Sequence, residues 1–178
     1  MGKKLLIIGA STYAVVASEI AADMNCFEKI DFIDDQKTET PTGIPVVGTS
    51  QNLAALSEVY DCVCVAIGNS RVRLSLLEKL RTETGYEIVS LVSPRAYVAP
   101  SAQVMPGCII EPMAVVHAQC VLETGCLISA GAVVNHASRC CEGVHVDCNA
   151  TVEGYCLVPV GTKIAAGTVY DKKELMNR

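Results

Sequence analysis

A six-residue repeat runs through the second half of the chain and restricts the folds that it can adopt. An aliphatic residue or a cysteine stands at every sixth position, twelve times without interruption. The series consists of Val98, Val104, Ile110, Val116, Leu122, Ile128, Val134, Cys140, Val146, Val152, Val158 and Ile164. A period of six fits neither an α-helix nor an alternating strand, and it is typical of a parallel β-helix.

The residues between the members of this series support the same fold. A small or branched residue follows each member by four positions, and glycine occupies six of the twelve positions that follow by three. Each hexad therefore predicts one short strand and one corner, and three hexads close a triangular coil. Residues 98–169 predict about four coils, and stacking of these coils forms the core. Hexapeptide prisms coil left-handed, unlike most parallel crossovers, so we expect a left-handed β-helix over residues 95–178.

Ten cysteines are distributed along the chain, and the repeat explains half of them. Cys108, Cys120, Cys126 and Cys156 fall at the small position of a hexad, and Cys140 falls at the aliphatic position. Free cysteine packs as a small hydrophobic residue, so these five are expected in the core. No Cys-x-x-Cys pair occurs, and we expect no metal site. The number of thiols favours a reducing compartment.

Composition excludes several classes of protein. The net charge is −5, which argues against a nucleic-acid partner. No run of 18 apolar residues occurs, so we expect no transmembrane helix and no membrane association. The apolar stretch that begins at Leu5 is too short for a signal peptide and lacks a cleavage site. We therefore expect a cytoplasmic protein.

The first part of the chain, residues 1–94, alternates strands and helices. Strands are predicted at 3–9, 29–33, 61–67 and 87–92. Helices are predicted from the glycine loop to about residue 24, at 51–59 with Ser50 as the capping residue, and at 70–83 with Val72, Leu76, Leu77 and Leu80 facing inward. This alternation predicts a Rossmann-like α/β domain with a parallel sheet and helices on both faces.

Two loops of this domain suggest a ligand site. The turn after Gly9 carries Ser11 and Ala14 where a dinucleotide fingerprint has its second and third glycines. It is either a phosphate-binding turn or an ordinary strand-to-helix turn. Asp34 and Asp35 follow the second strand, where carboxylates either bind ribose hydroxyls or a base edge, or are simply solvated. Both loops lie at carboxyl ends of strands, where open α/β sheets bind ligands.

Three histidines, His117, His136 and His145, all lie outside the inward positions of the hexads. A single exposed histidine is more often a solvated residue than a catalytic one, and we expect His117 to be structural.

Several motifs together resemble one family, the PglD/NeuD group of bacterial sugar acetyltransferases, over nearly the whole chain. These motifs are Gly9-Ala-Ser11, Asp34-Asp35, Ala66-Ile-Gly-Asn69 with Arg73, Pro100-Ser-Ala102 and the hexads. The resemblance implies that the first domain binds the uridine diphosphate of a nucleotide sugar. It also implies a homotrimer of β-helices, with acetyl-CoA in the cleft between neighbouring prisms.

The resemblance also implies roles for individual residues. His136 matches the general base, His145 a residue that contacts acetyl-CoA, and Gly154 and Gly167 match backbone contacts to acetyl-CoA. The nucleotide-sugar positions are Ser11, Thr12, Tyr13, Asp34, Asp35, Gly68 and Arg71.

These roles predict an acetyl-CoA-dependent N-acetyltransferase. Its expected substrate is a UDP-linked amino sugar, a UDP-4-amino-4,6-dideoxy sugar used for surface glycans. Imidazole, with an ordinary pKa of about 6.5, can take a proton from the attacking amine near neutral pH, and the backbone N–H of Gly154 can stabilise the oxyanion. Two alternatives remain open: O-acetylation of a sugar such as a sialic acid, and a non-catalytic protein that binds a nucleotide sugar or acts as a scaffold.

The chain departs from the family pattern at three places. Ala137 follows His136, where the family usually has a glutamate, so His136 either works without a carboxylate or uses Glu142 or Asp147. Thr12-Tyr13-Ala14 replaces the usual Gly-His/Phe-Gly of the first loop. Residues 170–178 are expected to form a short charged cap, which would leave a shallower acetyl-CoA cleft.

Overall fold

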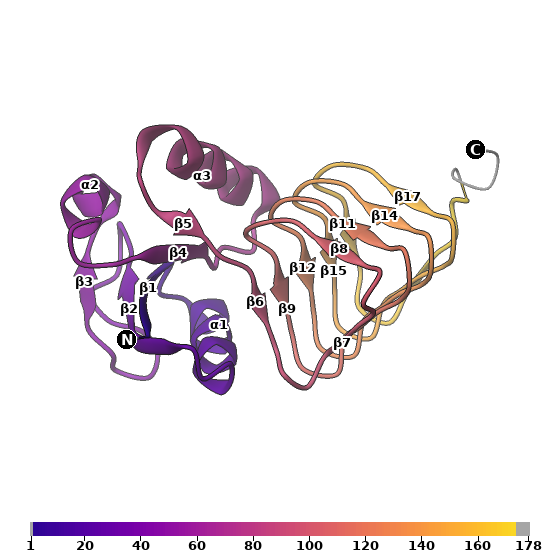
Figure 1. Cartoon of the computed structure of the whole chain (residues 1–178), viewed down its shortest axis with the longest axis horizontal. Coiled ribbons are helices and arrows are strands. Elements are labelled where there is room, and N and C mark those ends of the chain that lie inside the picture. The colour runs from indigo at the N-terminus through magenta and orange to yellow at the C-terminus, as the bar shows by residue number, and fades with distance from the viewer. Residues whose placement is uncertain (1, 174–178) are drawn as a thin grey trace. The chain divides into compact units, whose positions relative to one another are not determined.

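The computed structural model describes residues 2–173 of the chain, so part of the expected charged cap lies outside the described residues. The chain divides into two compact units, Met1–Leu91 and Val92–Arg178 (Figure 1). The first unit is an α/β domain and the second is a left-handed parallel β-helix, as the sequence predicts. None of the helices in residues 2–173 combines the length and hydrophobicity that a membrane-spanning segment requires.

The first unit is built on a five-stranded parallel sheet in the order β3-β2-β1-β4-β5. Its strands are β1 (Lys3–Ile8), β2 (Phe27–Ile33), β3 (Val46–Gly48), β4 (Cys62–Val65) and β5 (Glu87–Ile88). From the central strand β1 the chain continues to β2 and β3 on one side of the sheet, and then crosses to β4 and β5 on the other side. Right-handed crossovers therefore put helix α1 on one face and α2 and α3 on the other, as Figure 1 shows. Strand order reverses between β1 and β4, the switch point where such sheets bind ligands.

The helices of this unit differ in detail from the prediction. They are α1 (Thr12–Asp23), the 3₁₀ turn η1 (Ser50–Asn52), α2 (Leu53–Leu56) and α3 (Ser70–Glu83). The predicted cap at Ser50 is wrong, because Thr49 forms a capping box with Asn52. The stretch between the second predicted strand and this helix, where no strand was predicted, contains the edge strand β3, which extends the sheet beside β2.

Helix α3 buries a residue that the hydrophobic pattern did not select. Leu77 and Leu80 face the core as predicted, but Val72 is 45% exposed, so its predicted inward position is wrong. Arg73, the next residue, is fully buried instead. Hydrophobicity alone would favour burial of Val72 over burial of Arg73. Backbone carbonyls of the preceding loop accept hydrogen bonds from the guanidinium, and this satisfies the charge inside the domain.

The second unit winds three parallel sheets around a narrow prism. The first sheet contains β7 (Tyr97–Val98), β10 (Val115–Val116), β13 (Val133–Val134), β16 (Thr151–Val152) and β19 (Val169–Tyr170). The second contains β8 (Gln103–Val104), β11 (Val121–Leu122), β14 (Arg139–Cys140) and β17 (Leu157–Val158). The third contains β6 (Leu91–Val92), β9 (Ile109–Ile110), β12 (Leu127–Ile128), β15 (His145–Val146) and β18 (Lys163–Ile164).

The register of these sheets follows the sequence count. Each residue pairs with the one 18 positions later, for example Val116 with Val134. The β-helix is longer than predicted, because β6 adds one strand before the hexads and β19 adds one after them. The single strand predicted at 87–92 is wrong. Its first part is β5 of the α/β sheet, and its last part is β6 of the prism. Both parts carry aliphatic residues, and Val89 between them is also aliphatic, so the sequence pattern alone did not reveal the break.

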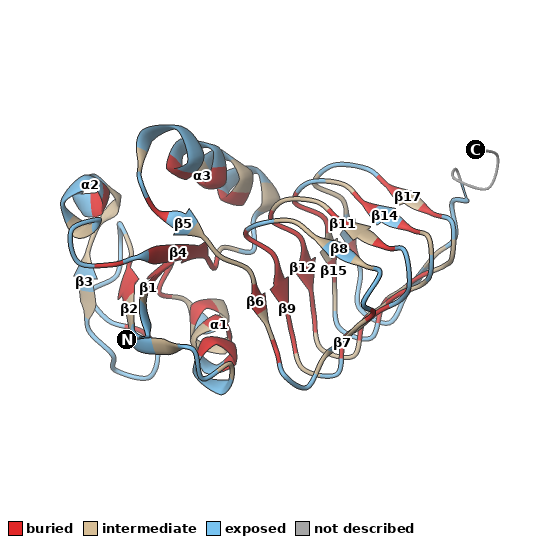
Figure 2. Cartoon of the chain, in the orientation of Figure 1, coloured by how far each residue is buried: buried red, intermediate tan, exposed pale blue. Residues whose placement is uncertain are grey.

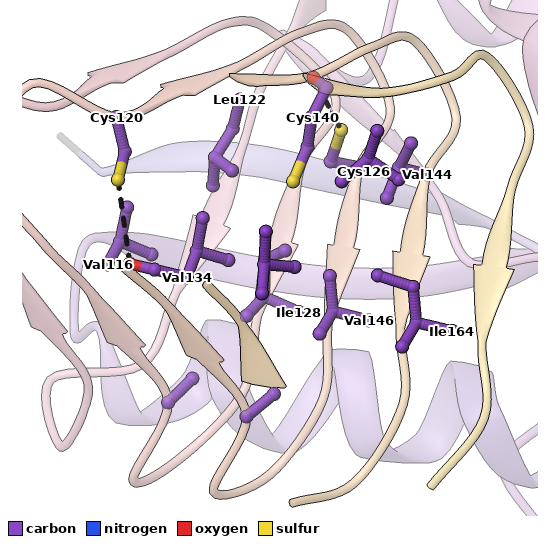
Figure 3. Close-up of a cluster of buried hydrophobic side chains, with 14 of the residues drawn as sticks. Val116, Cys120, Leu122, Cys126, Ile128, Val134, Cys140, Val144, Val146 and Ile164 are labelled. Carbon is purple, nitrogen blue, oxygen red and sulfur yellow. Dashed lines mark hydrogen bonds between the residues drawn. The ribbon is translucent and has the colours of Figure 1, made fainter. Parts of the chain in front are cut away.

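Side chains of the hexad series fill the prism. Figure 3 shows them in successive layers, with the cysteines among the aliphatic residues. The five cysteines assigned to packing are all fully buried, and Figure 2 shows buried segments in red on the strands of the coils. Thiols also donate to backbone carbonyls, as Cys120 Sγ does to Asn135 O at 3.0 Å. Burial raises the pKa of the Cys140 thiol above its usual range, which makes this group a poor nucleophile.

The corners explain the glycines of the repeat. Between residues 107 and 167, every residue three positions after a hexad member has a positive φ, and six of these eleven residues are glycine. Glycine takes this left-handed conformation without the steric cost of a β-carbon. The other five are Met113, Gln119, Ala137, Asn149 and Tyr155.

Candidate active site

The α/β unit has a cavity at the carboxyl ends of its central strands. Its volume is about 450 Å³. It is lined by Ile8, Gly9, Ser11, Ile33, Asp34, Asp35, Gln36, Ser50, Ala66, Ile67, Gly68, Val72 and Leu76. Four of the seven predicted nucleotide-sugar residues are therefore brought together here: Ser11, Asp34, Asp35 and Gly68. Thr12 and Tyr13 belong to the first turn of α1 and do not line the cavity. Arg71 is exposed in the first turn of α3 and does not line it either.

Asp34 holds the loops around this cavity. Its carboxylate accepts hydrogen bonds from the backbone N–H groups of Ala10 at 2.8 Å, Gln36 at 2.9 Å and Lys37 at 3.0 Å. Partial burial favours the neutral acid, but these three N–H groups and the Lys37 charge outweigh it and lower the pKa of Asp34. The carboxylate is thus a structural anion that joins the ends of β1 and β2.

Asp35 is also engaged by the protein. One oxygen accepts the Ser50 N–H at 2.7 Å, and the other accepts the Ser50 hydroxyl at 2.9 Å. Both aspartates are therefore held in place by the protein at the cavity wall. They shape the wall of the cavity and give it negative charge.

Arg73 supports the opposite wall. Its guanidinium donates to the carbonyl oxygen of Ile67 at 2.7 Å and to that of Gly68 at 2.9 Å. Asn69 caps α3 by accepting the Val72 N–H at 3.1 Å. These contacts fix the loop after β4, which lines the cavity. Arg73 is one of the motif residues that carry the family resemblance, but the sequence analysis assigned it no structural role.

In the β-helix, His136 and Gly154 lie on successive coils at the same corner. The imidazole covers the glycine so closely that a β-carbon on residue 154 would lie 2.8 Å from Cε1, 3.1 Å from Nε2 and 3.2 Å from Nδ1 of His136. Gly154 is not in the left-handed region, so space rather than backbone conformation requires glycine here. The structure therefore joins two of the residues that the sequence analysis selected.

The polar groups of this pair are available for a ligand. Among residues 2–173, no acceptor is recorded for the Gly154 N–H, and neither ring nitrogen of His136 has a hydrogen-bond partner. His136 is exposed. Neither carboxylate considered as its partner forms an ion pair with it, and Asp147 instead contacts Lys163 at 2.9 Å. Within the described residues of one chain, His136 has no carboxylate within ion-pair distance.

Tyr155, which the sequence analysis did not select, also contacts His136. The two rings pack edge to face, with centroids 5.1 Å apart and planes at 82°. Tyr155 follows Ala137 by 18 residues, so the spacing that stacks the coils could have identified it.

His145 belongs to a separate group on the third sheet. Its Nε2 lies 3.0 Å from the Ser129 hydroxyl and 3.8 Å from a carboxylate oxygen of Asp147. The hydrogen bond from Lys163 lowers the pKa of Asp147. The remaining predicted residue, Gly167, lies at another corner, where its N–H donates to the Cys148 carbonyl at 2.9 Å. No group of three or more His, Cys, Asp or Glu side chains in residues 2–173 is suited to hold a metal ion.

Comparisons with known proteins agree with this architecture. The family model of the PglD N-terminal domain matches residues 4–80. The acetyltransferase domain of PglB from Neisseria gonorrhoeae FA1090 is 31% identical, with a TM-score of 0.91 over 97% of this chain and 84% of that domain. This domain has also been solved in complex with acetyl coenzyme A. A comparison with curated protein sequences gave no match.

A second solved relative is perosamine N-acetyltransferase from Caulobacter crescentus, in complex with CoA and GDP-perosamine. A histidine-to-asparagine variant of that protein is 26% identical, with a TM-score of 0.78 over 95% of this chain and 89% of the other. The match to PglB spans most of both chains, and the family model covers most of the α/β domain. The chain therefore belongs to the PglD-type sugar acetyltransferases, and it is an acyltransferase of the hexapeptide-repeat superfamily.

Proposed function

We propose that the protein transfers the acetyl group of acetyl-CoA to the amino group of a UDP-linked amino sugar, with His136 as general base. The preferred substrate is a UDP-4-amino-4,6-dideoxy sugar destined for a surface glycan. Residues 95–178 would carry the transfer chemistry, and residues 1–94 would bind the nucleotide. The observation that carries this proposal is the exposed imidazole of His136 packed against Gly154, whose N–H has no acceptor among residues 2–173.

The geometry of this pair suits acyl transfer. An ammonium group must lose a proton before its nitrogen can attack a thioester, and the free ring nitrogens of His136 can accept that proton. The nitrogen then forms a bond to the carbonyl carbon, and the electron pair of the C=O bond moves to oxygen. The N–H of Gly154 can donate to this oxyanion. When the C–S bond breaks, the CoA thiolate takes a proton, and the product is an amide.

The lack of a carboxylate beside His136 favours an amine over a hydroxyl as the acceptor. A sugar hydroxyl is far less acidic than an ammonium group, so its deprotonation needs a stronger base. A neighbouring carboxylate would strengthen the imidazole, and none lies within ion-pair distance in the described residues. N-acetylation is therefore the primary proposal, and O-acetylation of a sialic acid is the variant.

The cavity of the α/β unit supports binding of a nucleotide diphosphate. Ser11 is the N-cap residue of the twelve-residue helix α1, and its hydroxyl makes no cap hydrogen bond. The N–H groups of the first turn, at Thr12 and Tyr13, are oriented to bind phosphate oxygens. Gly68 leaves the facing wall open, since a β-carbon there would meet nothing within 4 Å. Arg71 supplies an exposed positive charge on the adjacent helix.

His145 and Gly167 are proposed as acetyl-CoA contacts away from the reacting atoms. His145 is mostly buried, with 14% of its side chain exposed, and Ser129 orients it. The N–H of Gly167 is already used within the prism, so Gly167 would contact the cofactor through its exposed Cα.

A homotrimer is also proposed, because one outer face of the prism carries an apolar column. Successive coils of the first sheet present Tyr97, Val115, Val133, Thr151 and Val169. Tyr97 is 56% exposed and Val169 is 62% exposed in the single chain, and a second copy would cover them. All ten cysteines are free, which supports a reducing compartment such as the cytoplasm.

The test is a substrate panel with a matched histidine control. The purified protein is incubated with acetyl-CoA and 4-amino sugars linked to UDP or GDP, and with sialic acid, while thiol release and product mass are followed. We expect an amide product with a UDP sugar, loss of turnover in His136→Ala, and little change in His117→Ala. Full turnover in His136→Ala would disprove the mechanism. An ester product would indicate O-acetylation, and no calorimetric binding of acetyl-CoA would indicate a scaffold.

A further inference from the structure

The coil after His136 presents two consecutive residues to its imidazole. Gly154 lies under the ring, and Tyr155 packs against it edge to face. The N–H of Tyr155 also donates to the carbonyl oxygen of His136 at 3.1 Å. Backbone and side chain of Tyr155 are thus both directed to one residue, the proposed base.

The conformation of Tyr155 is unfavourable for its residue type. Its φ is +61°, at a corner position that is glycine in six other turns of the prism. A bulky side chain in this region is strained. The side chain contributes little to the core, since Tyr155 is 41% exposed. A strained, exposed aromatic residue beside a reactive group indicates a functional role better than a packing role.

His136 has few other contacts that could orient its ring. Its ring nitrogens have no partner among residues 2–173, and no carboxylate there lies within ion-pair distance. The next residue, Ala137, has only a methyl side chain and offers the imidazole no polar group. Gly154 limits how deeply the ring can sit, and the freedom that remains is rotation about the Cβ–Cγ bond of His136, which changes the tilt of the ring plane. Edge-to-face aromatic contacts depend on the angle between the rings, so Tyr155 is the contact that restricts rotation.

We propose that Tyr155 is a positioning residue that holds the imidazole of His136 over Gly154 in the orientation needed to accept the proton of the substrate amine. This role rests on the proposed function of His136. It requires the aromatic ring of Tyr155 and not its hydroxyl, because the recorded contact is between ring planes.

The test compares Tyr155→Phe with Tyr155→Asn. Phenylalanine keeps the ring contact, so we expect kcat within about twofold of the parent. Asparagine removes the ring, and we expect kcat to fall roughly 10- to 100-fold, as for other misplaced catalytic groups, with little change in KM for acetyl-CoA. Because asparagine tolerates positive φ better than tyrosine, the melting temperature of Tyr155→Asn should equal or exceed that of the parent. A residue that only supported the fold would lose stability and activity together.

Met113→Asn is the matched control, since Met113 is also an exposed apolar residue at a corner with φ of +64°. We expect this variant to keep parental kcat. Parental kcat in Tyr155→Asn would overturn the proposal. A loss in Tyr155→Phe as large as that in Tyr155→Asn would also overturn it, because the hydroxyl would then be the active group.

An activity-independent measurement separates this inference from the proposed function. The three-bond couplings between the Hβ protons and the ring carbons of His136, which report the rotation of the imidazole, should change in Tyr155→Asn and stay close to the parental values in Tyr155→Phe. Unchanged couplings in both variants would overturn the positioning role, whatever the activity. No turnover by the parent protein on any sugar would refute the proposed function instead, and the spectra would still show whether Tyr155 orients the ring.

Discussion

The stacking of His136 on Gly154 predicts the effect of the smallest possible substitution, Gly154→Ala. The added β-carbon would lie 2.8 Å from Cε1 of His136. Carbon atoms pack best at about 3.5–4.0 Å, so the ring must withdraw by roughly 0.7–1.2 Å. Displacement of a catalytic group by about 1 Å can lower the rate about 100-fold. We therefore expect kcat to fall by one to two orders of magnitude.

Stability should hardly change in the same variant. Gly154 is outside the left-handed region, so alanine can adopt its backbone conformation. Replacing glycine by alanine at such a position gains about 0.4–1 kcal/mol through the unfolded chain. His136 is exposed, so its ring can swing toward solvent at small cost. We expect the melting temperature to stay within about 4 °C of the parent.

The assay for Gly154→Ala is thiol release from acetyl-CoA at saturating amino sugar, together with thermal unfolding. Gly85→Ala is the control, since a β-carbon there meets nothing within 4 Å and its backbone φ is also outside the left-handed region. The variant keeps the N–H of residue 154, so a loss of rate reports the ring position and not a lost donor. Parental kcat with unchanged stability would refute the catalytic importance of this ring position.

Three further substitutions test the supporting structure by urea unfolding. Asp34→Asn should lower the free energy of unfolding by about 1 kcal/mol at pH 7. Because the folded-state pKa of Asp34 is lowered, the contribution of its carboxylate to stability is complete above the unfolded pKa of about 3.9 and is lost as the pH falls below it. If parent and variant differed in stability as much near pH 3 as at pH 7, this origin would be contradicted. Arg73→Met removes a buried donor from two loop carbonyls and should lower the free energy of unfolding by about 2–4 kcal/mol. The control Arg71→Met, at an exposed position, should lower it by less than about 0.5 kcal/mol. Equal losses in the two variants would argue against the buried contacts. Cys140→Ser introduces a hydroxyl into the apolar prism and should lower the free energy of unfolding by about 1–3 kcal/mol. Cys140→Val should lower it by less than about 1.5 kcal/mol. A serine variant as stable as the valine variant would show that the hydroxyl finds a hydrogen-bond partner.

The placement of residues within the β-helix followed from the sequence because the repeat is local, whereas the family was indicated by the resemblance of several motifs in both domains. A residue at the inward position of one hexad meets residues 18 positions away, in the same register in every coil. Counting therefore identified the buried cysteines, and the same period explains why His136 and Gly154, 18 residues apart, lie on successive coils in the structure. The position of the corner glycines followed from the same count, and the positive φ values supply its physical reason.

Tertiary structure alone decided features that depend on a few specific partners. The hydrophobic pattern of α3 selected Val72, but Arg73 is buried, because two carbonyl oxygens of the preceding loop satisfy its charge. The free energy of burying a guanidinium depends on the position of those acceptors, and no local pattern encodes it.

The candidate site shows the same division. Sequence reasoning proposed His136 and Gly154, and left open whether Asp34 was a ligand group or a solvated one. The structure shows that Asp34 is held by three backbone N–H groups, and that Tyr155 contacts the imidazole. Coil spacing determines which residues are neighbours. The orientation of a ring, and the number of donors around a carboxylate, depend on side-chain and loop conformations that form only when the whole chain has folded.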